Sequence, residues 1–138
     1  MTDDGEVRCE RLLDAVPEVA WRALTTAGAL ESWFWPASFA TEGDVDLRPG
    51  GRYRIASPVA GIAVSGRYTE VLPPCRLGFT WQWDGGDIES RVVIDLASTA
   101  AGTGLTLIHR GLAETEIANH AKGWSDCLDR LPGWLAAG

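Results

Sequence analysis

The fold is decided by the C-terminal stretch 111–131, which reads GLAETEIANHAKGWSDCLDRL. Its apolar and aromatic residues recur every three or four positions, the spacing of one face of an α-helix. Glu114 and Glu116 stand at the start of the stretch, where carboxylates complement the helix dipole. The pattern predicts one long helix whose apolar face needs a surface to cover it. The residues on that face are Ile117, His120, Ala121, Trp124, Cys127, Leu128 and Leu131.

The segment before this helix consists of short apolar runs separated by turn residues. Residues 76–83 alternate most regularly, with apolar side chains facing one way and polar or small ones the other. The tetrapeptide RPGG at 48–51 favours a tight turn, and residues 88–97 and 105–110 are the last predicted strands, joined by a turn at 101–104. Such short connections predict an antiparallel sheet of six or seven strands. Its inward face would carry Leu77, Phe79, Trp81, Trp83 and His109.

The N-terminal part of the chain predicts a strand followed by two short helices. Val7–Leu13 mixes apolar and charged side chains, as expected of a strand at the edge of a sheet. Pro17 fits the first turn of a helix that runs through Leu24. Thr26 can cap a second helix, which Pro36 stops. A sheet that grips the terminal helix is the simplest arrangement that buries both apolar faces, so the predicted fold class is α+β.

Length and charge set the broad class of protein. With 138 residues, of which 46% are hydrophobic, the chain suits one domain, residues 1–138, with a single core. Its 19 acidic and 12 basic side chains give a formal charge of -7, which repels phosphate backbones and anionic lipid heads. We therefore expect neither nucleic acid nor a membrane surface as a partner. The acidic N-terminus lacks the regions of a signal peptide and no run of about 18 apolar residues occurs, so we expect a cytoplasmic protein.

Cysteine and tryptophan usage adds two expectations. Cys9, Cys75 and Cys127 are widely separated and form no CxxC motif, which indicates reduced thiols. Seven tryptophans in a chain of this length indicate either a bulky core or a cavity lined by aromatic rings.

Several short motifs follow one another along the chain: PxxxWxALT at 17–25, LxxW at 30–33, DLRPGG at 46–51, GxYxEVxPPxRLxFTW at 66–81 and HxxGWxxxL at 120–128. Thr106, Leu107, His109, Gly111 and Leu112 match in part between the last two. With the order of elements, these motifs resemble the SRPBCC (START-like) superfamily, and within it the family named for the C-terminal domain of the heat-shock chaperone ATPase activator. The resemblance implies a helix-grip fold, in which a curved antiparallel sheet wraps around a long C-terminal helix after two short helices. It also implies a cavity between sheet and helix, often used for apolar small molecules.

The chain departs from this family at three places. Ala27 stands where the family often has Pro, and Phe34 where it often has a second Trp, so the second helix and its end of the cavity can differ. Pro132–Gly133 falls where the terminal helix usually continues. Because proline lacks the amide hydrogen and clashes with the preceding turn, at a cost of about 3 kcal/mol, we expect the helix to kink or end near Leu131. Trp134–Leu135 would then pack from an irregular tail or a redirected turn.

Gly123 bears on whether such a cavity is present. A glycine inside a helix costs about 1 kcal/mol relative to alanine and needs a compensating reason. The reason is either room for a ligand or for Trp81, or close packing of the helix backbone against the sheet. Aromatic residues of the inward faces are candidate ligand contacts, although plain core packing explains each of them as well. The candidate ligand-binding residues are Trp33, Trp35, Phe79, Trp81, Trp83, His109, His120, Gly123 and Trp124.

The two histidines, His109 and His120, are predicted on the last strand and on the facing helix. They could pair across the cavity as acid and base, with the hydroxyl of Tyr68, or one of them could polarise a bound carbonyl. Alternatively, each could be a buried side chain satisfied by a hydrogen bond. Glu70 and Glu89 could serve as bases only if they turned inward. Two histidines without an HExxH motif argue against zinc, and the motifs of nucleotide sites and serine hydrolases are absent, so we predict no metal and no cofactor.

Three functions stay open at this point. We favour a module that binds an apolar small molecule in the cavity. Such a module explains the number of tryptophans and the presence of Gly123, and it does not require catalytic residues that the chain lacks. The second is a cyclase- or hydrolase-like enzyme that uses the cavity histidines, which rests on fold analogy alone. The third is an interaction protein like the chaperone ATPase activator. The resemblance covers only the C-terminal type of domain, which argues against ATPase activation. The oligomeric state is open, a homodimer included.

Overall fold

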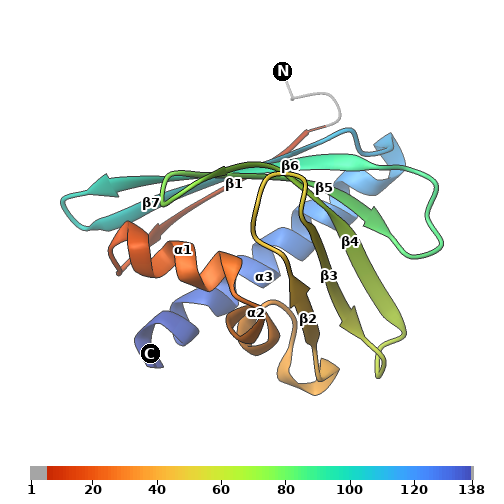
Figure 1. The fold of residues 1–138 in the computed structure, drawn as a ribbon, viewed down its shortest axis with the longest axis horizontal. Helices are drawn as coiled ribbons and strands as arrows, with labels where there is room; N and C mark the ends of the chain where they lie inside the picture. Colours follow the sequence, from red (N-terminus) through yellow and green to blue (C-terminus); the bar gives the residue numbers. More distant parts are fainter. Residues whose placement is uncertain (1–5, 138) are drawn as a thin grey trace.

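The computed structural model describes residues 6–137. Residues 1–5 lie outside this range, and they include part of the acidic N-terminus on which the expectation of no signal peptide rests. Strand β1 is followed by two short helices, a run of strands and a long C-terminal helix (Figure 1). The elements are β1 (Glu6–Leu13), α1 (Pro17–Thr25), α2 (Ala27–Trp33), the 3-10 turn η1 (Ala37–Phe39), β2 (Glu42–Val45), β3 (Arg52–Ser57), β4 (Ile62–Leu72), β5 (Arg76–Trp83), β6 (Ser90–Thr99), β7 (Gly102–Arg110), the 3-10 turn η2 (Glu114–Glu116) and α3 (Ile117–Ala137).

The seven strands form one antiparallel sheet in the order β1-β7-β6-β5-β4-β3-β2. Apart from β1, each strand neighbours the next one along the chain, as expected when short turns connect them. Figure 1 shows the sheet curving around α3, which crosses its concave side, while α1 and α2 cover the remaining opening. The predicted helix-grip architecture and the edge position of the first strand are confirmed.

Irregular pairing between β4 and β5 bends the sheet. The register shifts between Tyr68 and Glu70, and bulges of this kind bend a strand and increase its twist. A side chain on Gly66 would collide with the backbone of Thr80, so the two strands approach this closely only because residue 66 is glycine. The backbone N–H of Arg67 donates to the Thr80 hydroxyl, 2.9 Å away. The bend directs β3 and β2 around the helix.

The core lies between the concave face of the sheet and the C-terminal half of α3. Leu77, Leu105 and Leu107 from the sheet are almost fully buried, as are Leu128 and Leu131 from the helix. Burying each such side chain contributes about 1.5–3 kcal/mol relative to leaving it in water. The apolar stripe predicted for the terminal helix is therefore confirmed over this half. None of the helices within residues 6–137 is long and apolar enough to cross a membrane.

Differences from the predicted elements are confined to their ends. β6 begins at Ser90 rather than at residue 88, because Ile88 is half exposed in the preceding turn. β7 begins at Gly102, inside the predicted turn, which leaves a tighter connection at residues 100–101. Thr26 precedes α2 as predicted, but its hydroxyl donates to the Arg22 carbonyl of the first helix at 3.0 Å and does not cap the second.

We expected the terminal helix to kink or end near Leu131, and the predicted end is wrong, because α3 continues through Pro132 to Ala137. Pro132 and Gly133 face solvent, while Trp134 and Leu135 are half-buried against the core. The contacts of these two side chains offset the hydrogen bond that proline cannot donate to the preceding turn. Trp134 and Leu135 therefore pack from a regular helix rather than from an irregular tail.

Candidate ligand-binding cavity

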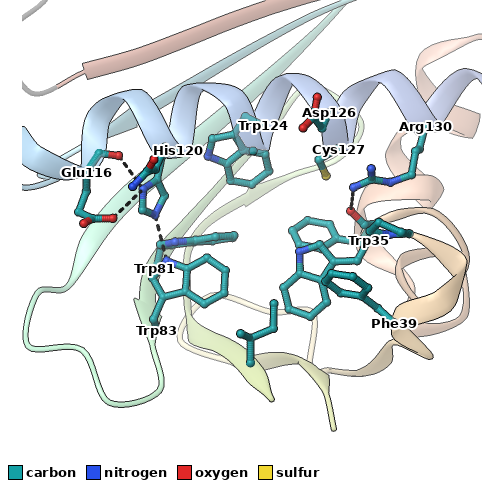
Figure 2. Close-up of a pocket in the computed structure, with 15 residues that line it drawn as sticks. Trp35, Phe39, Trp81, Trp83, Glu116, His120, Trp124, Asp126, Cys127 and Arg130 are labelled. Atoms are coloured by element: carbon teal, nitrogen blue, oxygen red, sulfur yellow. Dashed lines mark hydrogen bonds and ion pairs between the residues drawn. The ribbon is translucent and has the colours of Figure 1, made fainter. Parts of the chain in front are cut away.

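An open cavity of about 580 Å³ lies between the N-terminal half of α3, the adjoining ends of β4 and β5, and the segment that follows α2. Residues one helical turn apart on α3 form its roof, and Pro36 ends the helical segment so that the chain turns along its side. Figure 2 shows the labelled side chains of this cavity converging from these separate elements. The lining residues are Phe34, Trp35, Pro36, Phe39, Ile62, Trp81, Trp83, Glu116, Asn119, His120, Gly123, Trp124, Asp126, Cys127 and Arg130.

Aromatic rings form much of the cavity wall. The indoles of Trp35 and Trp83 are nearly parallel, with centroids 6.2 Å apart and an interplanar angle of 13°. Trp81 packs on Trp124 with centroids 4.9 Å apart, and Phe34 meets Trp124 edge-on at 5.9 Å. Phe34, Trp81 and Trp124 are buried in this packing, whereas the half-buried Trp35 and Trp83 leave part of their indole surface open, a surface that flat apolar molecules prefer to contact.

The charged groups of the wall are few and mostly engaged. The Arg130 guanidinium donates to the backbone carbonyls of Trp33 at 3.1 Å and Phe34 at 2.7 Å, where α2 ends. It thereby satisfies carbonyls that the helix leaves without partners and joins α3 to α2. Asp126 accepts from Lys122 at 3.0 Å on the outer side of α3. The roof thus carries acidic side chains, and its one arginine serves to hold the fold.

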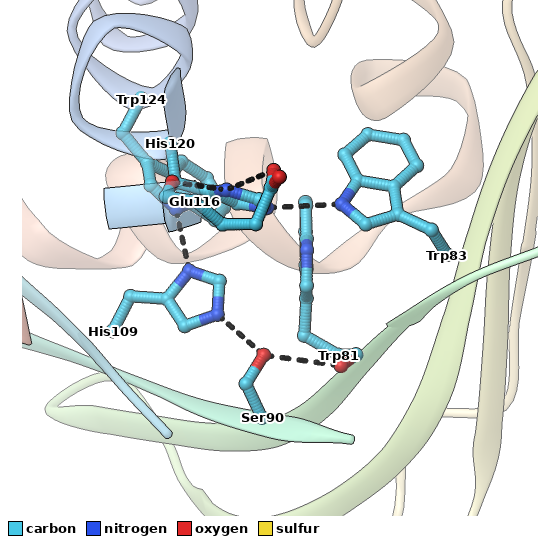
Figure 3. Close-up of polar contacts among 7 residues, drawn as sticks. All are labelled: Trp81, Trp83, Ser90, His109, Glu116, His120 and Trp124. Atoms are coloured by element: carbon cyan, nitrogen blue, oxygen red, sulfur yellow. Dashed lines mark hydrogen bonds and ion pairs between the residues drawn. The ribbon is translucent and has the colours of Figure 1, made fainter. Parts of the chain in front are cut away.

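His109 is completely buried behind the cavity wall and is fully hydrogen-bonded (Figure 3). The indole N–H of Trp124 donates to its Nδ1 at 2.9 Å, so the ring proton must be on Nε2. Nε2 lies 2.7 Å from the hydroxyl of Ser90, which in turn donates to the carbonyl of Trp81 at 3.1 Å. Burial first, and then the neighbouring His120, lowers the pKa of His109 from 6.5 to about 3. This histidine is held neutral.

His120 makes the corresponding bonds at the cavity itself. The indole N–H of Trp83 donates to its Nε2 at 2.9 Å, and its Nδ1 lies 2.9 Å from the backbone carbonyl of Glu116. The proton is therefore on Nδ1 in this arrangement. The rings of His109 and His120 are perpendicular, with centroids 5.3 Å apart, and each ring bonds to other groups rather than to its neighbour.

The structure brings most of the predicted ligand-binding residues to the cavity. Trp35, Trp81, Trp83, His120, Gly123 and Trp124 line it. Trp33, Phe79 and His109 do not. Trp33 is buried with its indole N–H on the Ala23 carbonyl at 2.8 Å, and Phe79 packs edge-on against Tyr53 in the core.

The weaker catalytic candidates lie elsewhere. Tyr68 is buried in the core, where burial raises its pKa, and its hydroxyl does not line the cavity. Glu70 forms an ion pair with Arg76 at 2.9 Å on the outer face, and Glu89 is exposed. Neither glutamate can act as a base inside the cavity. Within residues 6–137, no three His, Cys, Asp or Glu side chains gather closely enough to hold a metal ion.

Gly123 lies at the centre of the roof, and a methyl group at this position would meet no atom within 4 Å. Close packing of the helix backbone against the sheet is therefore not the reason for this glycine. Instead, Gly123 leaves open space in the cavity. Sequence reasoning missed Asn119, Glu116 and Arg130, although each follows from the helical spacing that identified His120. Phe39 and Ile62 come from separate segments, and no local pattern could have placed them at the cavity.

The curved sheet, the gripped helix and the cavity between them define a helix-grip domain of the START-like class. Residues 14–136 match the family model described as Activator of Hsp90 ATPase homolog 1-like protein, so the chain belongs to this family. None of the curated proteins matches the chain.

Solved structures share the fold over nearly the whole chain. It is similar to protein CV1439 from Chromobacterium violaceum, with 28% identity, 96% of this chain and 98% of the other covered, and a TM-score of 0.86. The AHSA1 protein SPO3351 from Silicibacter pomeroyi is 30% identical, with 96% and 98% covered and a TM-score of 0.77. DynU16, from the dynemicin biosynthetic locus, is 26% identical, with 97% of this chain but 48% of DynU16 covered and a TM-score of 0.84.

Proposed function

We propose that this chain is a small-molecule-binding domain that takes a flat, apolar ligand into the cavity under α3. The observation that carries the proposal is the open space of about 580 Å³ walled by Trp35, Trp81, Trp83 and Trp124. Ligand sites are typically concave, mostly apolar and of about 300–1,000 Å³. Trp35 and Trp83 are half-buried at this cavity, so part of their apolar surface meets water unless a ligand covers it.

The histidines favour binding over catalysis. His120 is the histidine that lines the cavity, and both of its ring nitrogens lie within hydrogen-bond distance of protein groups. His109 is neutral, buried and bonded at both nitrogens. An acid–base role would require each ring to exchange a proton with a substrate, and neither nitrogen is presented for that purpose. Interaction with a chaperone, which the family description suggests, stays a prediction that a pull-down with a chaperone middle domain tests.

The binding proposal is tested by calorimetric titration of naphthalene and its methyl, ethyl and acetyl derivatives, with tryptophan fluorescence as a second signal. We expect binding with a change in indole emission, because the cavity wall contains the emitting side chains. Absence of heat and of any emission change for all four compounds would overturn the proposal.

Leucine substitutions at two glycines of α3 test whether the ligand binds in this cavity. Gly123 lines the cavity and Gly133 does not, yet a Cβ at either position meets no atom within 4 Å. Replacing either with Leu improves helix propensity by a similar amount. The Gly123→Leu side chain extends into the cavity and should weaken binding at least about tenfold, whereas Gly133→Leu should bind as the wild type does. Equal affinities in the two variants would place the ligand elsewhere.

A further inference from the structure

Trp81 carries a buried hydrogen-bond donor that has no partner. The side chain is 4% exposed, and its indole Nε1 has no acceptor among the residues that the structure describes. Buried polar groups are nearly always hydrogen-bonded, and an exception in a native fold calls for an explanation such as a missing ligand or water.

The two histidine nitrogens that accept hydrogen bonds near Trp81 already have donors. Nε2 of His120 accepts from Trp83, and Nδ1 of His109 accepts from Trp124. Trp81 cannot turn to seek another acceptor, because its ring is enclosed by aromatic side chains. The ring centroids of Phe34, Trp83, His109 and Trp124 lie 6.2, 5.4, 5.5 and 4.9 Å from its own. No group within residues 6–137 accepts from this N–H, so its partner lies outside the described residues, as a ligand or a water molecule would.

The indole of Trp81 stands where two hollows meet. Besides the main cavity, a side hollow of about 270 Å³ lies between the turn after β5 and η2, lined in part by Gly86, Ile88 and Leu112. The two hollows share the side chains of Trp81, Trp83, Glu116 and His120. The hydrogen bond from Trp83 to His120 thus forms part of the partition between them, and Figure 3 draws it across the edge of the Trp81 ring.

Trp83 is the member of this partition best placed to move. It is half-buried, it is the last residue of β5, and the turn that follows it at residues 84–89 is exposed throughout. One side-chain hydrogen bond, to His120, fixes its indole N–H. Displacement of Trp83 joins the two hollows beside Trp81.

The charged side chains around the two hollows determine which kind of acceptor group the ligand can carry. Glu116 borders both hollows, Asp126 borders the main cavity and Asp87 the side hollow. Arg130, at the main cavity, keeps its positive charge while it donates to the carbonyls of Trp33 and Phe34. Asp126 is paired with Lys122 at 3.0 Å. Glu116 is the charged side chain that the two hollows share with Trp81, so a carboxylate or phosphate placed there would meet a like charge, whereas a carbonyl oxygen accepts a hydrogen bond without bringing a charge.

We propose that the Trp81 indole N–H donates a hydrogen bond to the carbonyl oxygen of a neutral aromatic ligand, which reaches it by displacing Trp83 from His120. This proposal rests on the proposed function, because it assigns one polar contact to the ligand of the same cavity. It adds a chemical class, aryl ketones and related neutral carbonyl compounds, and extends the site into the side hollow.

The test uses two probes of the same shape, acetylnaphthalene and the matching isomer of ethylnaphthalene, which differ in one carbonyl group. Calorimetry gives the ratio of their affinities for the wild type, for Trp81→Phe and for Trp83→Phe. We expect Trp81→Phe to shift this ratio against the acetyl probe by a few-fold to about tenfold, the usual effect of one hydrogen bond. Trp83→Phe removes the hydrogen bond to His120 that the acetyl probe has to break, so it should shift the ratio in the opposite direction, towards the acetyl probe.

A second measurement does not depend on the variants folding. In the wild-type chain, the indole N–H resonance of Trp81 should move downfield with the acetyl probe and stay near its free position with the ethyl probe. Suppose that both probes bind, that Trp81→Phe keeps the affinity ratio of the wild type, and that the two probes shift the Trp81 resonance equally. The carbonyl contact is then refuted and the binding function stands. If neither probe binds the wild type, the proposed function fails and this contact fails with it.

Discussion

Two tryptophan–histidine hydrogen bonds of equal length, 2.9 Å each, lie on either side of Trp81 and have different surroundings. The bond from Trp124 to His109 is buried between α3 and the sheet, and His109 is 0% exposed. The bond from Trp83 to His120 is partly buried and borders the cavity. We call the Trp124–His109 bond the closed pair, and it belongs to the core. We call the Trp83–His120 bond the open pair, and it belongs to the candidate site.

Burial, rather than bond geometry, decides what each pair does. A buried acceptor that loses its donor has no water to replace it, whereas an acceptor at an open cavity can bond to water. The closed pair therefore fixes a neutral histidine and the orientation of Trp124. The open pair can be exchanged for other contacts at little cost, which suits a wall that admits a ligand.

The largest expected effect is that of Trp124→Phe in the closed pair. It leaves Nδ1 of His109 without a donor and removes ring atoms from a packed site. We expect a loss of about 2–4 kcal/mol in the free energy of unfolding, which urea denaturation followed by circular dichroism measures. A loss no larger than that of Trp83→Phe would contradict the distinction between the two pairs.

The next largest expected effect is a dependence of the free energy of unfolding on pH, which the titration of His109 causes. Its pKa of about 3 in the folded chain lies below the ordinary 6.5, so the unfolded chain binds a proton that the folded chain does not. The contribution is complete above pH 6.5 and is lost as the pH falls towards 3, at about 1.4 kcal/mol per pH unit. Between pH 7 and pH 5 this histidine should lower the free energy of unfolding by about 2 kcal/mol.

A variant isolates this histidine from the carboxylates that titrate in the same range. His109→Gln retains an acceptor for Trp124 and a donor for Ser90 but cannot titrate. The urea-derived stability of this variant should change less between pH 7 and pH 5 than that of the wild type. Parallel stability curves for the two proteins would show that His109 is not held neutral by the fold.

The sequence was enough for the fold because the fold depends on repeated patterns. Alternation along residues 76–83 and the helical stripe of α3 each involve several side chains, so one irregular residue does not hide them. Pro132 shows the limit, since its local effect predicted an end to the helix. The contacts of Trp134 and Leu135 with the core are long-range and decided the outcome.

The site was only partly predictable, because each partner is set by a contact between distant segments. Periodicity placed His109 and His120 on facing elements, and their rings do lie 5.3 Å apart. It could not show that each ring takes an indole N–H, or that Trp81 is left without an acceptor. Those facts depend on side-chain rotamers within an aromatic cluster, which no spacing rule encodes.

The smallest expected effect is that of Trp83→Phe in the open pair. Phenylalanine keeps a ring on the wall beside Trp35, and water from the cavity can donate to the vacated Nε2 of His120. The loss in the free energy of unfolding should therefore be about 1 kcal/mol, near the net value of one hydrogen bond. The ¹⁵N shift of His120 Nε2 should change in this variant while that of His109 Nδ1 stays as in the wild type. A loss of several kcal/mol, or a shift at both histidines, would mean that the open pair also belongs to the core and that the partition cannot yield to a ligand.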